Sequence, residues 1–246
     1  QLNLAHDTSY IDFIKKVSGR GPLRSALAYL FDPRIQYYNR ISSNTFLAAT
    51  YAAGAVCNAV DNTVAGVHQR SFCIVRPPGH HAGTNRGEGF CIFNNVAIGA
   101  LYSRSLGLDR VAIVDFDRHH GNGTAQILDE RGTGEVLLLS SFQSGCKYSP
   151  NNILRLSDDG MCRIPIPEGS RYQKVEEIYK KFVIPTLIDW EPDLIFISAG
   201  FDMHASDPLT NIKLASREYY CLTRLIVEAA NMVCDGKVIS VLEGGY

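Results

Sequence analysis

The stretch Val111–Thr124 constrains the fold of this chain more than any other part of the sequence. It begins with a short apolar run, Val111–Val114, which is bounded by polar residues and therefore predicts a buried strand. The run leads into Asp115, Asp117 and His119, which follow one another at every second position. Because successive side chains of an extended chain alternate between its two faces, these three are expected to point the same way. The sequence thus predicts a strand that ends in two carboxylates and an imidazole.

Such a strand end has two interpretations. Two carboxylates and an imidazole can hold a metal ion, since Zn2+ accepts both oxygen and nitrogen ligands. Alternatively, the acidic side chains accept hydrogen bonds from the following loop, and the motif alone does not separate the two interpretations. The glycines of His120–Thr124 permit a tight turn, after which a helix is expected.

Other apolar runs along the chain are also continuous rather than alternating, and segments with helical spacing separate them. This order is typical of a parallel sheet with helices on both faces. We therefore expect an α/β fold of three layers, α/β/α, with a central, mainly parallel sheet, and a helix disturbed at Pro185. The expected strands are 71–75, 111–116, 135–141, 161–166, 193–198 and 237–242, and the expected helices are 8–17, 45–60, 96–106, 123–131, 172–189 and 216–235.

Composition excludes several classes of protein. With 24 basic and 25 acidic residues, the chain lacks the charge excess of a protein that binds nucleic acid or an anionic membrane. No apolar stretch is long enough to span a bilayer, and no signal peptide is visible. The seven cysteines are scattered without a Cys-x-x-Cys pair, which favours a reducing, intracellular setting over a disulfide framework. We expect one domain over residues 1–246, with flanking sequence missing at both ends because Gln1 is not methionine and Tyr246 closely follows a strand-like run.

The loops after the predicted strands hold the residues that could carry chemistry. In parallel sheets of this kind, ligands bind outside the carboxyl ends of the strands. A concentration of titratable groups there, in a chain of balanced charge, indicates an active site rather than a binding module alone. Five of the seven histidines lie on these loops: His80, His81, His119, His120 and His204. His6 and His68 lie elsewhere and are expected to be structural.

The loops and their neighbours carry, in order, the motifs Arg76-Pro-Pro-Gly-His-His-Ala82, Gly89-Phe-Cys91, Phe93-Asn-Asn95, Asp115-x-Asp-x-His-His-Gly-Asn-Gly-Thr124, Ala199-Gly-Phe-Asp202 and Glu243-Gly-Gly-Tyr246. Together they resemble the zinc-dependent histone deacetylases, and the forms His120-Gly-Asn-Gly-Thr124 and Leu242-Glu-Gly-Gly-Tyr246 resemble the class II branch. Each motif alone is weak, but the ordered set is specific. The resemblance implies a fold of the arginase/deacetylase type.

The resemblance implies that the zinc ligands are Asp117, His119 and Asp202. Three protein ligands leave a fourth position for water, as a catalytic zinc requires. Without the resemblance, Asp202 would be taken for an acidic turn residue after Gly-Phe. The implied task of Asp115 is to orient a histidine and to help hold a monovalent cation, K+, to which Ser140 is also expected to contribute.

The resemblance also assigns the two adjacent histidines. His81 shuttles a proton between the water and the leaving amine, which an imidazole can do because it titrates near neutrality, whereas His80 provides electrostatic support. Asp115 is expected to pair with His80, and Asn122 with His81. An amide stabilises an imidazolium less than a carboxylate does, so His81 should stay neutral and basic. The alternative is an ordinary loop pair after Pro-Pro-Gly.

By the same resemblance, the hydroxyl of Tyr246 stabilises the oxyanion of the reaction, whereas a Gly-Gly-Tyr in isolation would indicate only an aromatic residue after a turn. Gly89 and Phe90 are expected to form one wall of a narrow channel for an acyl-lysine side chain. Cys91 is expected to be a packing residue. Leu209 stands where polyamine-specific relatives have an acidic residue, which favours acyl-lysine.

The chain departs from the family pattern in several places. Arg118 replaces an aliphatic residue and, by alternation, should face away from the site towards a partner or solvent. Glu88 is expected to place a charge at the rim of the channel. Residues 142–170 lack the family's Phe-Phe-Pro-Gly segment, so the second aromatic wall of the channel is not assigned. Met203 and His204 are also unusual after the third zinc ligand.

The function implied by the resemblance is that of a zinc-dependent hydrolase that removes acetyl groups from lysine side chains of histones or other proteins. One rival is an acetylpolyamine amidohydrolase, and another is a catalytically silent scaffold subunit that binds acyl-lysine. The complete set of zinc ligands together with His81 and Tyr246 argues against the silent subunit. A manganese arginase-like hydrolase would need more acidic residues at these loops.

The expected partners follow from the same resemblance. They are an acetyl-lysine protein substrate, with histone tails foremost, and a corepressor-type complex, with no direct binding of nucleic acid and no membrane. The expected location is intracellular, in the nucleus, the cytoplasm or both.

Overall fold

The computed structural model describes residues 1–19, 32–35, 39–132, 134–150 and 160–246. Within them lies one six-stranded sheet of strand order β1-β6-β5-β2-β3-β4, in which every pair of neighbours is parallel. The strands are β1 (Arg70–Cys73), β2 (Val111–Asp115), β3 (Val136–Gln143), β4 (Met161–Ile166), β5 (Leu194–Ala199) and β6 (Val238–Leu242). The expected fold, a three-layer α/β/α architecture around a parallel sheet, is confirmed.

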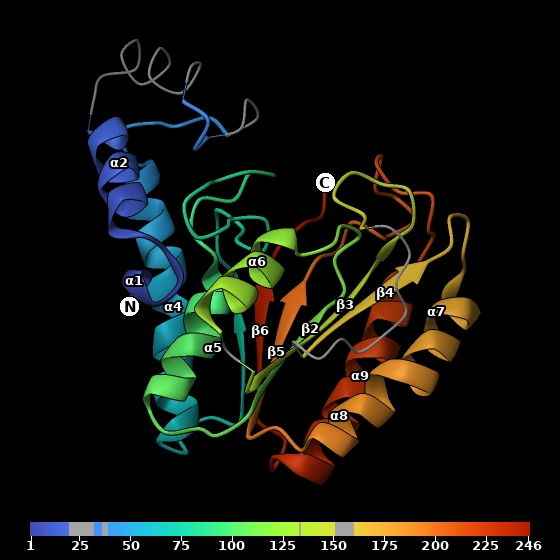
Figure 1. Cartoon of the computed structure of the whole chain (residues 1–246). Coiled ribbons are helices and arrows are strands. Elements are labelled where there is room, and N and C mark those ends of the chain that lie inside the picture. The colour runs from blue at the N-terminus through green and yellow to red at the C-terminus, as the bar shows by residue number, and fades with distance from the viewer. Residues whose placement is uncertain (20–31, 36–38, 133, 151–159) are drawn as a thin grey trace.

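Helices cover both faces of the sheet (Figure 1). On one side lie α1 (Leu2–Ala5), α2 (Thr8–Ser18), α4 (Thr45–Val64), α5 (Asn95–Ser105) and α6 (Asn122–Arg131); on the other lie α7 (Tyr172–Ile178), α8 (Ile184–Trp190) and α9 (Ser216–Val233). Between α7 and α8 the turn η1 (Tyr179–Val183) is π-helical. Within the described residues, no helix is long and apolar enough to cross a membrane.

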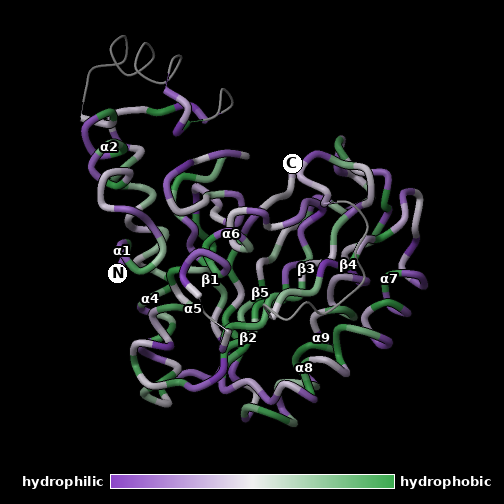
Figure 2. Tube along the Cα trace, viewed as in Figure 1, coloured by the Kyte–Doolittle hydropathy of each residue, from purple (hydrophilic) through white to green (hydrophobic). Residues whose placement is uncertain are grey.

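The strands are apolar because both faces of the sheet are packed. All residues of β2, β3 and β5 are buried, and the hydropathy view shows apolar chain concentrated in the sheet (Figure 2). Alternate residues of β2 face opposite ways: Ala112 and Val114 pack towards α7–α9, whereas Val111 and Ile113 pack towards α4 and α5. Burial of such side chains contributes about 1.5–3 kcal/mol each.

Two details differ from the expected elements. The strand expected at 71–75 ends at Cys73, ahead of the proline pair that cannot extend a ladder. The helix expected at 172–189 is disturbed over Tyr179–Val183, immediately before Pro185, which stands in the first turn of α8. Proline lacks the N–H that would bond the carbonyl four residues earlier, and the wider π-turn lies where that bond is missing.

Candidate active site

The ends of β2 and β5 bring Asp117, His119 and Asp202 together, with one potential ligand atom of each lying within 4.8 Å of the others. The Nδ1 atom of His119 lies 3.1 Å from Oδ1 of Asp117 and 3.0 Å from Oδ2 of Asp202. Both carboxylates are completely buried, while the imidazole is partly exposed. The three residues that the sequence predicts as metal ligands therefore form one cluster.

Backbone donors hold the two carboxylates in place. Strand β2 ends at Asp115, and beyond it Oδ1 of Asp117 accepts a hydrogen bond from the His119 N–H at 2.8 Å. The N–H of Gly244 donates to the other oxygen of Asp117 at 2.8 Å, and the N–H of Arg118 donates to Oδ1 of Asp202 at 2.8 Å. Each carboxylate thus has one oxygen fixed by the backbone of a neighbouring loop.

The cluster has the properties of a metal site. Among the described residues, Oδ2 of Asp202 is buried and accepts no hydrogen bond of good geometry; its polar neighbour is Nδ1 of His119 at 3.0 Å, which faces both carboxylates. Buried carboxylate oxygens normally have a hydrogen-bond donor. Burial and the charge of Asp117 raise the pKa of Asp202 to about 6, as expected when two carboxylates share a site without a cation. One nitrogen and two oxygen donors suit Zn2+, so the residues present fit the metal that the sequence implies.

The paired histidines have different partners, as the sequence predicts. Nδ1 of His80 lies 3.0 Å from Oδ2 of Asp115, and Nδ1 of His81 lies 2.6 Å from Oδ1 of Asn122. The two rings lie side by side with centroids 4.0 Å apart. Because the amide oxygen only accepts, His81 carries its proton on Nδ1 when it is neutral, which leaves the lone pair on Nε2.

The different partners shift the two pKa values in opposite directions. Burial opposes a charge on His80, but Asp117, Asp115 and Glu243 outweigh it and raise the pKa of His80 well above its ordinary value. Burial and the neighbouring charge of His80 lower the pKa of His81 well below its ordinary value. His81 is therefore neutral and His80 cationic in the absence of a metal ion.

Two acidic residues support the histidines in ways that the sequence did not predict. Glu243 is buried, and its Oε2 accepts from the N–H groups of Gly79 and His80 at 2.7 and 3.0 Å. Glu88, expected to place a charge at the channel rim, has two side-chain partners. Its Oε1 accepts from Nδ2 of Asn122 at 2.9 Å, and its Oε2 pairs with Arg86. Position within a strand-end motif was the only sequence signal for Glu243, since its contacts are to backbone groups.

Ser140 lies next to Asp115 across the β2–β3 ladder, at the expected cation site. Its hydroxyl lies 2.8 Å from Nδ1 of His120, and burial lowers the pKa of that histidine to about 3. These contacts place Ser140 beside the loop that carries Asp117 and His119. The role of Ser140 in binding a monovalent cation stays a prediction.

One wall of the expected channel lies against the second histidine. Gly89 and Phe90 both have positive φ, of 55° and 68°. A side chain at Gly89 is excluded because its Cβ would lie 2.2 Å from Cδ2 of His81. The Phe90 ring lies 5.9 Å from the ring of Tyr246, centroid to centroid. Phe90, Leu209 and Tyr246 are 44%, 48% and 53% exposed, so apolar surface is available where an acyl-lysine stem is expected.

Tyr148 lies where the sequence left the second wall of the expected channel unassigned. Its ring packs on the ring of His81 with centroids 4.2 Å apart, and lies 6.4 Å from that of His119. Tyr148 belongs to the loop after β3, part of which (residues 151–159) lies outside the described residues. A tyrosine without the family's flanking phenylalanine and glycine gave no recognisable motif.

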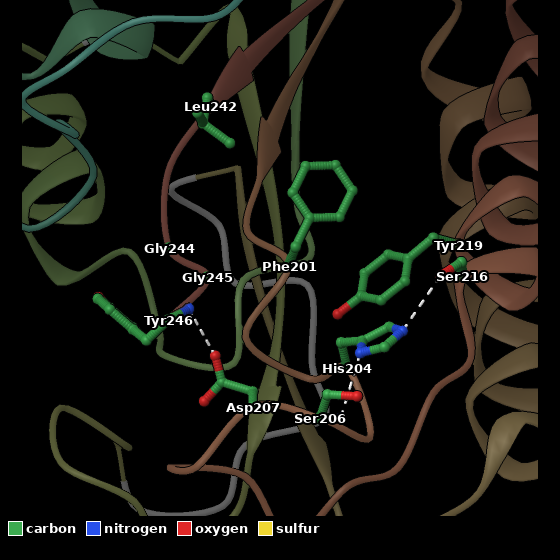
Figure 3. A pocket seen from close by; sticks show the side chains of 10 residues that line it. All are labelled: Phe201, His204, Ser206, Asp207, Ser216, Tyr219, Leu242, Gly244, Gly245 and Tyr246. Atoms are coloured by element: carbon green, nitrogen blue, oxygen red, sulfur yellow. Dashed lines mark hydrogen bonds between the residues drawn. The ribbon is translucent and has the colours of Figure 1, made fainter.

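Tyr246 follows the Gly244–Gly245 turn, which contacts Asp117 of the Asp-His-Asp group. Its N–H donates to Oδ2 of Asp207 at 2.7 Å, and in Figure 3 its side chain points away from Tyr219. Burial and the charges of Asp117 and Asp202 raise the pKa of the Tyr246 phenol, so the hydroxyl keeps its proton. A cavity of about 540 Å3 adjoins the turn, lined by Gly244, Gly245 and Tyr246 and by residues that include Phe201, His204 and Tyr219 (Figure 3).

The remaining predicted residues lie apart from the cluster. His6 is buried, with Nδ1 2.9 Å from the Gly83 carbonyl oxygen and Nε2 accepting from the N–H of Asn94 at 2.8 Å. His68 is on the surface. Cys91 is buried, and its sulfur accepts from the His81 N–H at 3.4 Å. These contacts are consistent with packing roles for His6 and Cys91.

A parallel sheet that carries an Asp-His-Asp cluster and two paired histidines at its carboxyl edge defines an α/β protein of the arginase/deacetylase type. The histone deacetylase domain matches residues 1–246, and the chain belongs to the histone deacetylase family. It aligns over its whole length with the crystal structure of the HDA15 HD domain, at a TM-score of 0.85 and 29% identity, and covers 68% of that chain.

Curated relatives agree with the class II-like resemblance. The chain is 39% identical to type-2 histone deacetylase 2 of Dictyostelium discoideum over 85% of its own length and 13% of the relative's. It is 34% identical to histone deacetylase 14, chloroplastic, of Arabidopsis thaliana over 98% of its length and 58% of the relative's. A histone deacetylase-like amidohydrolase of Pseudomonas aeruginosa is 33% identical over 84% of the chain and 55% of the relative. The chain thus spans less than two thirds of these relatives.

Proposed function

We propose that the chain is the catalytic domain of a zinc-dependent deacetylase that hydrolyses the acetyl amide of lysine side chains in proteins, including histones. The observation that carries this proposal is that a group of potential zinc ligands and a pair of histidines lie side by side. Asp117, His119 and Asp202 form a site suited to zinc, and beside it His80 and His81 differ in their partners and in the direction of their pKa shifts. Family membership supports the same reaction class.

Zinc bound by Asp117, His119 and Asp202 would act as a Lewis acid on the acetyl carbonyl and would lower the pKa of a water molecule. The chain's own residues supply the proton transfers. Nε2 of His81 accepts the proton of the attacking water, and the same atom returns it to the leaving lysine amine. Asn122 holds the ring in the tautomer that leaves Nε2 able to accept.

The other residues bind and orient the substrate. The phenol of Tyr246 donates a hydrogen bond to the oxygen on which negative charge develops, which is effective because the hydroxyl is protonated and preorganised. Phe90 and Tyr148 enclose the aliphatic stem of the lysine. His80, whose Nδ1 lies 3.0 Å from Oδ2 of Asp115, provides electrostatic support beside the developing charge.

An acetylpolyamine amidohydrolase is the alternative that one observation could favour, because an amidohydrolase is among the relatives. A polyamine carries a second ammonium group, for which a carboxylate at the channel is expected. Leu209 is half exposed and apolar, and the nearby Asp207 already accepts hydrogen bonds from the backbone of Leu209 and Tyr246. The site therefore suits acetyl-lysine better than an acetylated polyamine.

The test compares the two substrates directly. Zinc-reconstituted protein is incubated with an acetyl-lysine peptide and with an N-acetylpolyamine, and kcat/KM is measured for each. A kcat/KM at least tenfold higher for the peptide supports the proposal. A higher value for the polyamine, or binding of the peptide without turnover, contradicts it. Two relatives are named as chloroplastic proteins, so membership of the family does not by itself place the chain in the nucleus.

A further inference from the structure

A cationic side chain, Arg118, lies at the outer edge of the candidate metal site. Its Nε donates to Oε1 of Gln143 at 3.1 Å, and its Nη1 lies 3.3 Å from Nε2 of His119. The same Gln143 oxygen accepts from the N–H of Asn211 at 3.1 Å. Arg118 is thus held between the loops that follow β2 and β5 and the end of β3, on the side of the imidazole that faces away from the metal ligand atoms.

Across residues 1–19, 32–35, 39–132, 134–150 and 160–246, no carboxylate forms an ion pair with Arg118. The acidic residues near the channel have donors of their own. Glu88 is bonded by Arg86 and Asn122, and Asp207 by backbone N–H groups. A partly buried guanidinium whose acceptor is a neutral amide retains the capacity to bind an anion.

The tautomer of His119 sharpens this conclusion. Its Nδ1 faces Asp117 and Asp202, so a metal ion held there would use the lone pair of Nδ1, and the ring proton of His119 would then be on Nε2. The Nε2–H of His119 and the N–H of Arg118 are then two donors 3.3 Å apart, and neither can accept from the other. Both donors need an acceptor from outside, and a carboxylate has two oxygens that can serve them.

A second cation lies on the aromatic ring that packs against His81. Nζ of Lys147 is 4.9 Å from the centroid of the Tyr148 ring, which in turn packs on His81. Arg118 and Lys147 therefore place positive charge beside the site at which the acyl-lysine side chain is expected to enter. This charge attracts acidic peptides and repels basic ones.

We propose that Arg118, together with the Nε2–H of His119, forms a carboxylate-binding subsite at the mouth of the channel. The chain consequently prefers acetyl-lysine substrates that carry an acidic side chain next to the modified lysine. This inference rests on the proposed deacetylase function and names its substrate class, and Arg118 acts in it as a specificity-determining residue.

The test uses zinc-reconstituted protein and acetyl-lysine peptides that differ only in the residues flanking the lysine: aspartate, serine or lysine. The value of kcat/KM is expected to be about fivefold higher for the aspartate peptide than for the serine peptide, as for a partly exposed charge pair. This ratio should fall when salt is added, because salt screens the charges. Arg118→Gln should reduce the ratio to about one, and Arg118→Lys should retain part of it. Because the ratio compares two substrates of one variant, a general loss of activity does not affect it.

A matched control removes the same charge elsewhere. Lys237 precedes β6, at the amino ends of the parallel strands and so away from the site at their carboxyl ends. Lys237→Gln should leave the ratio unchanged. A readout other than turnover comes from zinc-loaded Tyr246→Phe protein, to which the aspartate peptide should bind more tightly than the serine peptide by fluorescence anisotropy. Equal kcat/KM values in the wild type, or a preference that survives in Arg118→Gln, would overturn the subsite and leave the deacetylase function standing. Failure of the wild type to process any of the peptides would overturn the function itself.

Discussion

His80 and His81 are adjacent, but what lies behind each ring gives them different chemistry. A carboxylate, Asp115, backs His80, and an amide, Asn122, backs His81. The first arrangement stabilises an imidazolium, and the second leaves a neutral base next to it. Asn122, the first residue of α6, therefore determines that Nε2 of His81 is the ring nitrogen that can accept a proton.

We predict that His81→Ala lowers kcat by a factor of about 10²–10⁴, because removal of a general acid–base group typically costs this much. Zinc content, measured by atomic absorption, should stay at the wild-type level because His81 is not among the predicted ligands. His68→Ala, which alters an exposed histidine, is the control and should retain full activity. A fully active His81→Ala protein would refute the assigned role.

Burial of His6 should make the free energy of unfolding sensitive to acid. Burial lowers its pKa from 6.5 to about 4, so the unfolded chain binds the proton more tightly than the folded chain does. The stabilisation is complete above pH 6.5 and is lost as the pH falls towards 4. Between pH 7.5 and pH 5 this residue should lower the free energy of unfolding by about 2 kcal/mol.

Urea unfolding of the wild type and of His6→Gln at the two pH values measures this contribution. The variant should be less stable at pH 7.5, because it loses the bonds to Gly83 and Asn94, but its stability should fall less towards pH 5. His68→Gln is the matched control and should follow the wild type. An identical pH dependence in His6→Gln would show that His6 is not responsible.

Not every residue of the site was predictable from its own type. Asp117, His119 and Asp202 stand in recognisable motifs because metal binding demands particular side chains at particular spacings. Tyr148 was not predictable, because an aromatic ring in an irregular loop can reach the site only through the path of the loop. Glu243 was overlooked for a different reason: it acts on backbone N–H groups, which carry no sequence signal.

At the scale of elements, the strand ends determine the site. The loop after β5 and the turn after β6 approach the loop after β2 so closely that glycine is required. A Cβ at Gly200 would lie 2.1 Å from Oδ2 of Asp117, and one at Gly244 would lie 2.5 Å from the same atom and 2.8 Å from Oδ2 of Asp202. Two turns thus form part of the candidate metal site without contributing a side chain.

We predict that Gly244→Ala weakens zinc binding by at least about tenfold, since the added methyl group displaces two ligand carboxylates. Competition with a fluorescent zinc chelator gives the affinity. Gly54→Ala is the control: a methyl group at this position in α4 would meet no atom within 4 Å, so the change should preserve zinc affinity and stabilise the helix by up to about 1 kcal/mol. Unaltered zinc affinity in Gly244→Ala would contradict the close packing of the turn.

The elements themselves were largely predictable because strands buried on both faces are continuously apolar. β4 was placed correctly even within an irregular region, because four of its six residues are apolar and buried; Arg163 and Pro165, which interrupt the pattern, are partly exposed on this edge strand. The π-turn before Pro185 was predicted only as a disturbance, because proline removes a backbone donor without specifying how the helix adapts. The alternation of side chains beyond Asp115 was applied past the end of the strand. Asp117 and His119 nevertheless lie together, because backbone hydrogen bonds fold the loop back onto the carboxylates of Asp115 and Asp117.

At the scale of the whole molecule, the fold buries two carboxylates of like charge close to each other. Asp117 and Asp202 are completely buried and arrive from different strands, and the pKa of Asp202 is raised by burial and by Asp117. Zinc would offset this charge and bind only the folded chain, and it should therefore stabilise the fold by about 2.7 kcal/mol at a free concentration about one hundred times its Kd.

We predict opposite effects of Asp202→Asn on the metal-free and zinc-saturated protein. Without metal, removal of one buried charge should raise Tm by a few degrees, whereas zinc should no longer stabilise the variant. Differential scanning fluorimetry with and without zinc gives both values. Equal zinc-induced shifts in the variant and the wild type would exclude Asp202 as a ligand.

The central claim is that zinc held by Asp117, His119 and Asp202 makes this chain a lysine deacetylase. The most direct measurement is the turnover of a fluorogenic acetyl-lysine peptide by purified protein, first stripped of metal and then titrated with Zn2+ while bound zinc is counted. Turnover should be absent from the stripped protein, rise in proportion to bound zinc up to one ion per chain, and be abolished by a hydroxamate chelator. A folded protein that binds one zinc ion per chain and releases no acetate from the peptide would contradict the claim.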